Sequence, residues 1–164
     1  MKGKSIRTLC GYFCFVVSLL LVLCFLPLAG CSLPRIVILE DPLSPEEHLN
    51  LGVAYEQKGE WESAINEYKA ASKKLPMAYT YLGNVYFQKT EFQVAEEYYR
   101  KAIKKDPENA DAYNNLAWLY LTKKEQLEEA EQLALKAIEL NPSKRDVYQD
   151  TLDQIRAVRI CPPK

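Results

Sequence analysis

Few side chains in this chain of 164 residues could do covalent or metal chemistry. It has a single histidine, His48, and five cysteines: Cys10, Cys14, Cys24, Cys31 and Cys161. A Cys–His pair would have to join His48 to Cys161, which lies at the far end of the sequence, and a metal site needs several clustered ligands. The glycines beyond Gly30 stand alone, so they form no phosphate-binding loop. We therefore expect no catalytic residue, no metal site and no cofactor, and the chain is not predicted to be an enzyme.

One cysteine stands in a pattern that has a chemistry of its own. The tetrapeptide Leu28-Ala29-Gly30-Cys31 ends an uncharged, strongly apolar stretch that begins at Leu9. The basic residues before this stretch are Lys2, Lys4 and Arg7. A basic start, an apolar run and small residues at its end are typical of an export signal. The tetrapeptide resembles the lipobox of bacterial lipoproteins, and this resemblance implies that residues 1–30 are a signal peptide cleaved before Cys31.

The same resemblance assigns a lipid to Cys31. It implies that the thiol takes a diacylglycerol through a thioether and that the new amino terminus takes a further acyl chain such as palmitate. Several acyl chains give lasting attachment, whereas one is marginal. The predicted location is a cell membrane, lipid-anchored and facing the periplasm. Ser32 stands where an aspartate commonly retains lipoproteins at the inner membrane, which favours the outer membrane of a Gram-negative cell. The alternative is an uncleaved transmembrane helix, because the apolar stretch is about long enough to span a bilayer.

The charged residues exclude one class of partner. The first 30 residues hold three of the 21 basic side chains and none of the 22 acidic ones, so the remainder carries 18 basic and 22 acidic side chains. A nucleic-acid-binding surface needs clustered positive charge to displace counterions from phosphate. We therefore expect no nucleic-acid partner.

A pattern of seven ordered positions occurs three times between about residues 45 and 142. It consists of Leu-Gly or Leu-Ala, a tyrosine, an alanine, a second tyrosine or alanine, another alanine and a proline. The second copy follows the first with a shift of 31 at every position, and the third follows the second with a shift of 34 or 35. The first copy comprises Leu51, Gly52, Tyr55, Ala64, Tyr68, Ala71 and Pro76.

This pattern resembles the tetratricopeptide repeat, in which each repeat is a pair of helices stacked on its neighbours. The resemblance implies an all-α fold: a right-handed superhelical array of three helical hairpins plus a C-terminal capping helix. The expected domain covers residues 44–158, with repeats at about 45–76, 77–107 and 108–142 and the capping helix at about 143–158. Residues 31–43 are expected to be the lipidated cysteine and an extended tether, and residues 159–164 a disordered tail.

Several packing details follow from the aligned copies. Gly52 and Gly83 are expected to let the paired helix approach closely. The third copy has one extra residue between Tyr120 and Ala130, which we expect in its inner turn. His48 takes the place of an aromatic residue in the other copies, so we expect it to be partly buried. The acidic pairs near the starts of second helices are expected to favour the helix dipole; they are Glu96-Glu97 and Glu128-Glu129.

The first helix of each hairpin is expected to line a concave groove. Leu51, Gly52 and Tyr55 pack on the second helix, so the positions that flank them point the other way. By this phase the groove-facing positions are Leu49, Asn50, Val53, Glu56, Thr80, Tyr81, Asn84, Phe87, Gln88, Asn114, Asn115, Trp118 and Leu121. The predicted partner-binding residues among them are Asn50, Val53, Tyr81, Asn84, Gln88, Asn115 and Trp118.

These residue types favour binding of a polypeptide. Asparagine side chains can donate to and accept from a peptide backbone, and Tyr81 and Trp118 are rigid apolar anchors. No lysine or arginine occurs among these positions. Tetratricopeptide domains that bind a chaperone's C-terminal carboxylate use lysine and arginine there together with asparagine, so we do not expect a carboxylate clamp.

The sequence thus predicts a membrane-anchored protein–protein interaction scaffold or adaptor in the bacterial cell envelope. Its partners would be an unidentified envelope protein or peptide, bound in the groove, and the membrane, bound through the lipid anchor. Two alternatives stay open. One is an accessory subunit of an envelope cysteine peptidase, because Asp41–Gly52 resembles the start of the repeat tail behind papain-like domains in some bacterial lipoproteins. The other is a self-associating structural lipoprotein, for example a homodimer.

Overall fold

The computed structural model describes residues 41–160, so the predictions about the leader, Cys31, most of the tether and Cys161 lie outside the described residues. Within that range all regular structure is helical. The elements are α2 (Pro45–Gln57), α3 (Trp61–Ala71), α4 (Ala78–Gln88), α5 (Phe92–Lys105), α6 (Ala110–Lys123), α7 (Leu127–Leu140), the short 3-10 helix η1 (Pro142–Lys144) and α8 (Arg145–Ile160). None of these helices has the length and apolar character needed to cross a bilayer.

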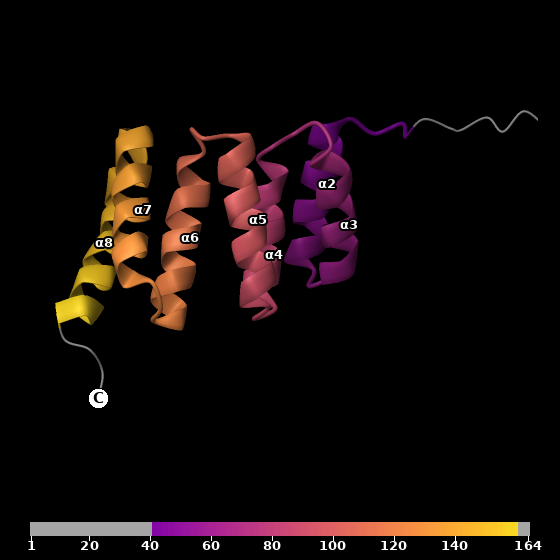
Figure 1. The fold of residues 1–164 in the computed structure, drawn as a ribbon. Coiled ribbons are helices and arrows are strands. Elements are labelled where there is room, and N and C mark those ends of the chain that lie inside the picture. Colours follow the sequence, from indigo (N-terminus) through magenta and orange to yellow (C-terminus); the bar gives the residue numbers. More distant parts are fainter. Residues whose placement is uncertain (1–40, 161–164) are drawn as a thin grey trace, which may run out of the picture. The chain divides into compact units, whose positions relative to one another are not determined.

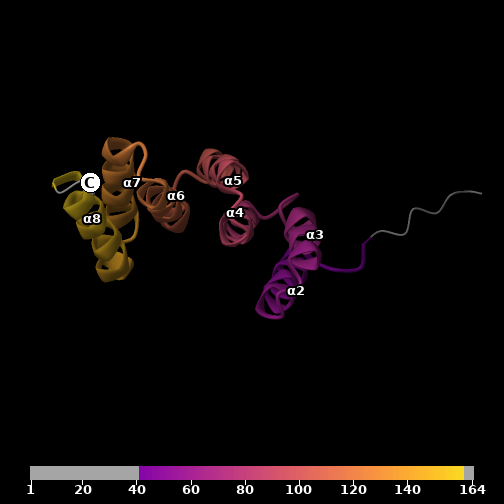
Figure 2. The ribbon, with the colours of Figure 1, turned by 90° about the horizontal axis from the view of Figure 1, so that it is seen from below.

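Six of the helices pair into three hairpins, α2 with α3, α4 with α5 and α6 with α7 (Figure 1). Successive hairpins touch through α3 and α4 and through α5 and α6, and α8 packs on α7 and α6. Seen from below, the hairpins follow one another in chain order (Figure 2). The predicted all-α array of three hairpins and a C-terminal helix is confirmed.

Local signals set where the helices begin. Helix α2 starts with a capping box, in which the Glu47 N–H donates to Ser44 Oγ at 3.1 Å and the Ser44 N–H donates to the Glu47 carboxylate at 2.7 Å. These two bonds satisfy backbone donors that have no partner inside the helix. At the start of α6, Asn109 Oδ1 accepts from the Ala112 N–H at 3.0 Å. Both caps stand at the start of the first helix of a hairpin.

The three inner turns are equally long, with three residues between the paired helices. The extra residue of the third copy lengthens α6 beyond Tyr120, so the prediction that it lies in the inner turn is wrong. The inner turn of the third hairpin differs from the others in its backbone, because Lys124 and Gln126 both adopt left-handed conformations, with φ of 55° and 51°. The first two turns use one such residue each, Gly59 at φ 75° and Thr90 at φ 61°.

The core combines small and aromatic side chains. Gly52 and Gly83 each face a tyrosine ring of the second helix, because an added Cβ would lie 2.6 Å from Tyr68 Cδ1 and 2.5 Å from Tyr99 Cδ1. Both rings are 2% exposed or less. The glycines therefore make room for a specific side chain, which is more than the close helix approach predicted for them. The alanines of the repeat pattern are fully buried: Ala64, Ala71, Ala95, Ala102, Ala130 and Ala137.

Helix α8 covers the last hairpin with Tyr148, Leu152 and Ile155, all of which are buried. It continues to Ile160, so the prediction of a disordered tail from residue 159 is wrong for its first two residues. Arg159 holds this end of the helix, because it forms ion pairs with acidic residues of α7.

The two acidic pairs differ in position. Glu128 and Glu129 lie in the first turn of α7, where they favour the helix dipole. Glu96 lies beyond the first turn of α5 and instead pairs with Arg100 at 3.1 Å, so the dipole interpretation is wrong for this residue.

Candidate functional site

Three adjoining hollows lie along the first helices α2, α4 and α6, and all three share Asn84. The hollow between α2 and α4 has a volume of ≈ 390 Å³, and the two between α4 and α6 have volumes of ≈ 200 and ≈ 190 Å³. We term their combined lining the groove. It consists of Val53, Glu56, Gln57, Met77, Thr80, Tyr81, Asn84, Phe87, Gln88, Tyr99, Asn109, Asp111, Asn115 and Trp118.

The structure brings together six of the seven predicted partner-binding residues. Val53, Tyr81, Asn84, Gln88, Asn115 and Trp118 line the groove. Asn50 is exposed on α2 but lines none of the three hollows. Whether these residues bind a partner remains a prediction, but their gathering on one surface is a finding.

Other positions assigned to the groove by helical phase are buried. Leu49 is 9% exposed and Leu121 is 8% exposed, because both belong to the hydrophobic core. Asn114 is 9% exposed, and its carbonyl oxygen has no hydrogen-bond partner among residues 41–160. The prediction that these three residues face the groove is therefore wrong. Thr80 lines the groove but is only 6% exposed.

A polar network fixes the centre of the groove. Asn84 Oδ1 accepts from the Tyr99 hydroxyl at 2.9 Å and from Asn115 Nδ2 at 2.8 Å. Burial raises the pKa of Tyr99, so its hydroxyl stays protonated and can donate. Among the described residues nothing accepts from Asn84 Nδ2 or donates to Asn115 Oδ1. The pair therefore retains a donor group and an acceptor, which are the groups that the C=O and N–H of a peptide backbone require.

A second polar group lies between α2 and α4. The Tyr68 hydroxyl donates to Glu56 Oε2 at 2.6 Å, and Gln88 Nε2 donates to Glu56 Oε1 at 2.7 Å. Burial, followed by the bond to Glu56, raises the pKa of Tyr68, so it also remains a donor. Tyr81 stands beside this group, with its ring centroid 5.3 Å from that of Tyr68. The carboxylate is thus held by two neutral donors next to an aromatic wall.

Asp111 is the other acidic residue of the groove, and its charge is balanced. Lys144 Nζ lies 2.8 Å from its carboxylate, and the Tyr148 hydroxyl donates to it at 2.7 Å. Burial acts to raise the pKa of Asp111, but the hydrogen bonds from Lys144 and Tyr148 outweigh it and lower the pKa below its usual value. This end of the groove is therefore close to electrically neutral.

The apolar part of the groove is supplied mainly by Trp118. It is 36% exposed on α6, so it does not pack in the core as an ordinary buried tryptophan would. Phe87 lines the same hollow from α4. A half-exposed indole beside a second aromatic ring is a typical anchor for an apolar side chain of a partner.

The hydroxyl groups of Tyr68 and Tyr99 were not predicted to serve the groove. The sequence does contain a signal for them, since each tyrosine lies 16 residues after the glycine that admits its ring. In the repeat pattern these tyrosines were assigned only to packing. Their hydroxyls pass beside the glycines and reach the polar groups on the groove side.

His48 lies away from the groove and has no catalytic surroundings. It is 8% exposed, with Nδ1 2.6 Å from Glu67 and Nε2 3.0 Å from Asp41. The bond to Glu67, opposed by burial and aided by the charge of Asp41, raises the pKa of His48. Both ring nitrogens are engaged, and no cluster of ligands suited to a metal ion exists among residues 41–160. The imidazole therefore fastens the start of the described chain to α2 and α3.

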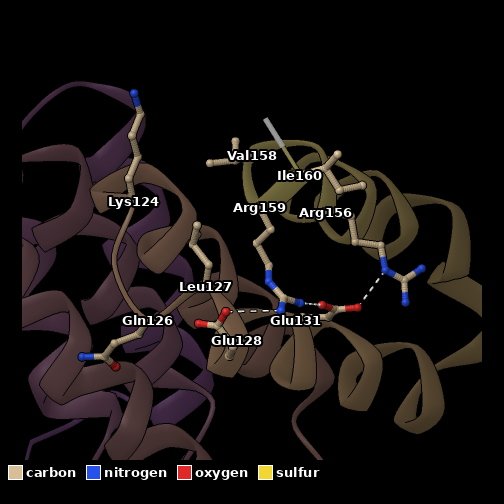
Figure 3. A pocket seen from close by; sticks show the side chains of 9 residues that line it. All are labelled: Lys124, Gln126, Leu127, Glu128, Glu131, Arg156, Val158, Arg159 and Ile160. Atoms are coloured by element: carbon tan, nitrogen blue, oxygen red, sulfur yellow. Dashed lines mark hydrogen bonds and ion pairs between the residues drawn. The ribbon is translucent and has the colours of Figure 1, made fainter. Parts of the chain in front are cut away.

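A further hollow, with a volume of ≈ 660 Å³, lies between α7 and α8 at the other end of the described residues (Figure 3). The acidic side chains that line it already have arginine partners. Arg156 Nε lies 2.8 Å from Glu131, and Arg159 pairs with both Glu131 and Glu128. These pairs attach α8 to α7, which is a structural role, so size alone does not make this hollow the functional site.

Comparison with known proteins agrees with the repeat pattern. Residues 47–76 and residues 80–144 each match a family model described as tetratricopeptide repeat. No curated protein sequence matches the chain significantly.

Solved structures resemble the chain in fold. The first tetratricopeptide domain of Spaghetti (RPAP3), bound to an HSP90 peptide SRMEEVD, has a TM-score of 0.64 at 22% identity and covers 73% of this chain and 96% of its own. The TPR2B domain of yeast Sti1 in an Hsp70 complex has a TM-score of 0.63 at 21% identity, covering 69% and 96%. The Yersinia enterocolitica type III secretion chaperone SycD, with a peptide of the translocator YopD, has a TM-score of 0.62 at 21% identity, covering 70% and 92%.

Proposed function

The chain carries tetratricopeptide repeats, and we propose that it is a protein-binding scaffold whose groove receives an extended segment of a partner polypeptide. The observation that carries this proposal is the alignment of three hollows along α2, α4 and α6, which meet at Asn84. Peptide-like hydrogen-bonding groups lie at the centre, and aromatic side chains stand on either side of it. Preformed hollows in which apolar side chains accompany fixed polar groups are the usual form of a binding site.

The solved relatives support this kind of ligand. Three of them were determined with a bound peptide or partner, as their descriptions state. The peptide on the Spaghetti domain, SRMEEVD, has an acidic end. The groove of the present chain contains no lysine or arginine, so it lacks the cations that such an end would require. We infer that this scaffold binds peptides of a different chemistry.

The proposed site of action is the bacterial cell envelope, with the scaffold held at the membrane through a lipid on Cys31. This part of the proposal rests on residues 1–31 of the sequence, which form a basic and apolar leader that ends in Leu28-Ala29-Gly30-Cys31. A lipid tether would keep the repeats close to the membrane while leaving the groove accessible. No sequence feature suited to catalysis accompanies it.

Photocrosslinking of the full-length chain in living bacteria tests the groove. A photoreactive amino acid would replace Gln88 in the groove and, in a matched control, Asn66, which is exposed on α3 outside the three hollows. Crosslinked partners are expected at position 88 only, and the additional substitutions Asn84→Ala and Trp118→Ala should abolish them. Equal crosslinking at both positions, or products that survive the two substitutions, would show that the groove is not the binding surface.

Replacement of Cys31 tests the anchor separately. In cells fed an alkyne-labelled fatty acid, the wild-type chain is expected to take up label and to sediment with membranes. Cys31→Ala should lose the label and its leader processing. A Cys31→Ala chain that is still labelled would refute lipidation at this residue, and an unlabelled, uncleaved wild-type chain in the membrane would support the transmembrane alternative.

A further inference from the structure

We propose that the hollow between α2 and α4 recognises a lysine or arginine side chain of the bound peptide, with Glu56 as its counter-ion. This inference rests on the proposed function, because it names the chemistry of the peptide that the groove takes. The residues that line this hollow are Val53, Glu56, Gln57, Tyr81, Asn84 and Gln88.

Among the residues that the structure describes, Glu56 has no counter-ion. No lysine, arginine or histidine within residues 41–160 lies within ion-pair distance of its carboxylate, and its two bonds come from the neutral groups of Tyr68 and Gln88. A carboxylate has about four acceptor positions, so these bonds leave about half of them available. Glu56 lines a hollow of ≈ 390 Å³, which is large enough for the end of a long side chain. The hollow therefore presents a positioned, partly buried negative charge.

The carboxylate is also held by side chains of two hairpins. The Tyr68 ring lies beside Gly52 and is fully buried, so packing fixes the hydroxyl that donates to Glu56 Oε2. Gln88 reaches across from the next hairpin to fix the other oxygen. A charge-assisted hydrogen bond to such a fixed acceptor is roughly twice as strong as a neutral one. Tyr81 can add a cation–π contact, which stabilises guanidinium and ammonium groups within about 6 Å of a ring.

Charge complementarity selects the occupant. An acidic segment would bring like charges together, and an apolar side chain would leave the Glu56 carboxylate desolvated without compensation. A lysine or arginine satisfies the carboxylate and fills the hollow with its aliphatic stem. At the other end of the groove, Asp111 is already neutralised by Lys144, and Trp118 offers an apolar contact. The expected ligand thus has a basic residue that lies on the α2 side of the asparagine pair and an apolar residue on the α6 side.

A phage library of random linear peptides, selected against the detergent-solubilised full-length chain, tests both the binding of peptides in the groove and the role of Glu56. We expect enriched peptides to share a lysine or arginine at one position. In fluorescence anisotropy, Glu56→Gln should weaken the binding of a selected peptide about tenfold, the effect of losing one charge-assisted bond. It should also reduce the salt dependence of binding. Glu97→Gln, which removes an exposed charge outside the groove, should change neither. Circular dichroism checks that the Glu56→Gln chain is as helical as the wild type.

The outcomes separate the two proposals. If no peptide is enriched relative to the Asn84→Ala, Trp118→Ala chain, groove binding itself is refuted. If peptides are enriched but lack a common basic residue, or if they bind the Glu56→Gln chain as tightly as the wild type, the groove binds peptides and the role of Glu56 is refuted. Selection against a Glu56→Lys chain should reverse the preference toward acidic peptides, and an unchanged preference would also overturn the inference.

Discussion

The first two hairpins and the third share one repeat pattern but fill its centre in opposite ways. In the first two, a glycine of the first helix faces a buried tyrosine of the second, Gly52 with Tyr68 and Gly83 with Tyr99. At the equivalent positions the third hairpin has Ala117 and Ala134, both fully buried. The third hairpin therefore has two small residues where the other two have one large residue and one without a side chain.

The exchange has a consequence for the groove. The tyrosine rings pass beside the glycines, so their hydroxyls reach Glu56 and Asn84 and orient both. The third hairpin has no tyrosine at that position, and its own Tyr120 donates away from the groove to Glu96 at 2.7 Å. Glycine in this repeat therefore does more than shorten the distance between two helices. It admits a side chain that supports the binding surface from behind.

The largest predicted effect comes from breaking one glycine–tyrosine pair. Tyr99→Ala should lower the free energy of unfolding by about 3–5 kcal/mol, because it empties the space of a buried ring. Gly83→Ala should lower it by about 1–3 kcal/mol through overpacking. The double variant recreates the alanine pair of the third hairpin, so its loss should be smaller than the two losses added together by at least ~1 kcal/mol. Urea denaturation of the full-length chain in mild detergent, followed by circular dichroism, measures all three.

The matched control lies in the third hairpin. Ala117→Gly should lower the free energy of unfolding by only about 1 kcal/mol, the difference in helix propensity. The facing helix has no tyrosine at the equivalent position that could fill the space of the removed methyl group. If the Gly83→Ala and Tyr99→Ala losses are simply additive, the two residues do not compete for space. The contrast between the hairpins would then have no energetic basis.

This contrast also shows what the sequence could predict. The shift of 31 between the first two copies located both hairpins, and the phase of α2, α4 and α6 placed Val53, Asn84 and Trp118 on one surface. Such inferences succeed because they depend on spacing within one helix or between copies. The inner turn of the third copy was mistaken because an extra residue can be absorbed either by a turn or by a helix end, and the spacing does not distinguish them.

The errors at the groove have a different origin. Leu49, Asn114 and Leu121 were assigned to the groove by helical phase, but they are buried in the packed array. Burial of that kind depends on how hairpins pack against one another, which no single-helix periodicity contains. The partners of His48 were equally inaccessible, because Glu67 comes from another helix and Asp41 precedes the domain. Side-chain networks of this type require the tertiary arrangement.

The first and third hairpins also differ in what covers them at the two ends of the array. The third hairpin is covered by the apolar side chains of α8, whereas the first hairpin is fastened by the ion cluster of His48, Asp41 and Glu67. We expect His48→Gln to lower the free energy of unfolding by about 1.5 kcal/mol, the lower end for a hydrogen bond to a charged group, because Glu67 is partly solvated. Substitutions on α8 should show no comparable dependence on pH.

The sign of the pH dependence follows from the raised pKa of His48. Its stabilising contribution is fully present below the ordinary pKa of 6.5 and is lost as the pH rises through the higher pKa of the folded chain. The lowered pKa of Asp41, caused first by the backbone hydrogen bond from Leu43, acts only in acid, near and below its ordinary value of 3.8. Unfolding curves between about pH 5 and 9 should therefore show a decline that His48→Gln removes and Glu67→Gln reduces. An equal decline in the His48→Gln chain would assign it to other groups.

The smallest effect is expected at the inner turns, where the first and second hairpins differ by one residue. Gly59 and Thr90 occupy equivalent positions, and both adopt a left-handed conformation, with φ of 75° and 61°. Glycine reaches this conformation freely, whereas a β-branched residue is strained in it. Thr90→Gly should therefore raise the free energy of unfolding by about 0.5–1 kcal/mol, since the relief of strain exceeds the entropy that glycine adds to the unfolded chain. The Thr90 hydroxyl donates only to the adjacent Lys89 carbonyl, so little else is lost. Gly59→Thr should have the opposite sign, and if both substitutions destabilise the chain, the turns are limited by contacts other than backbone conformation.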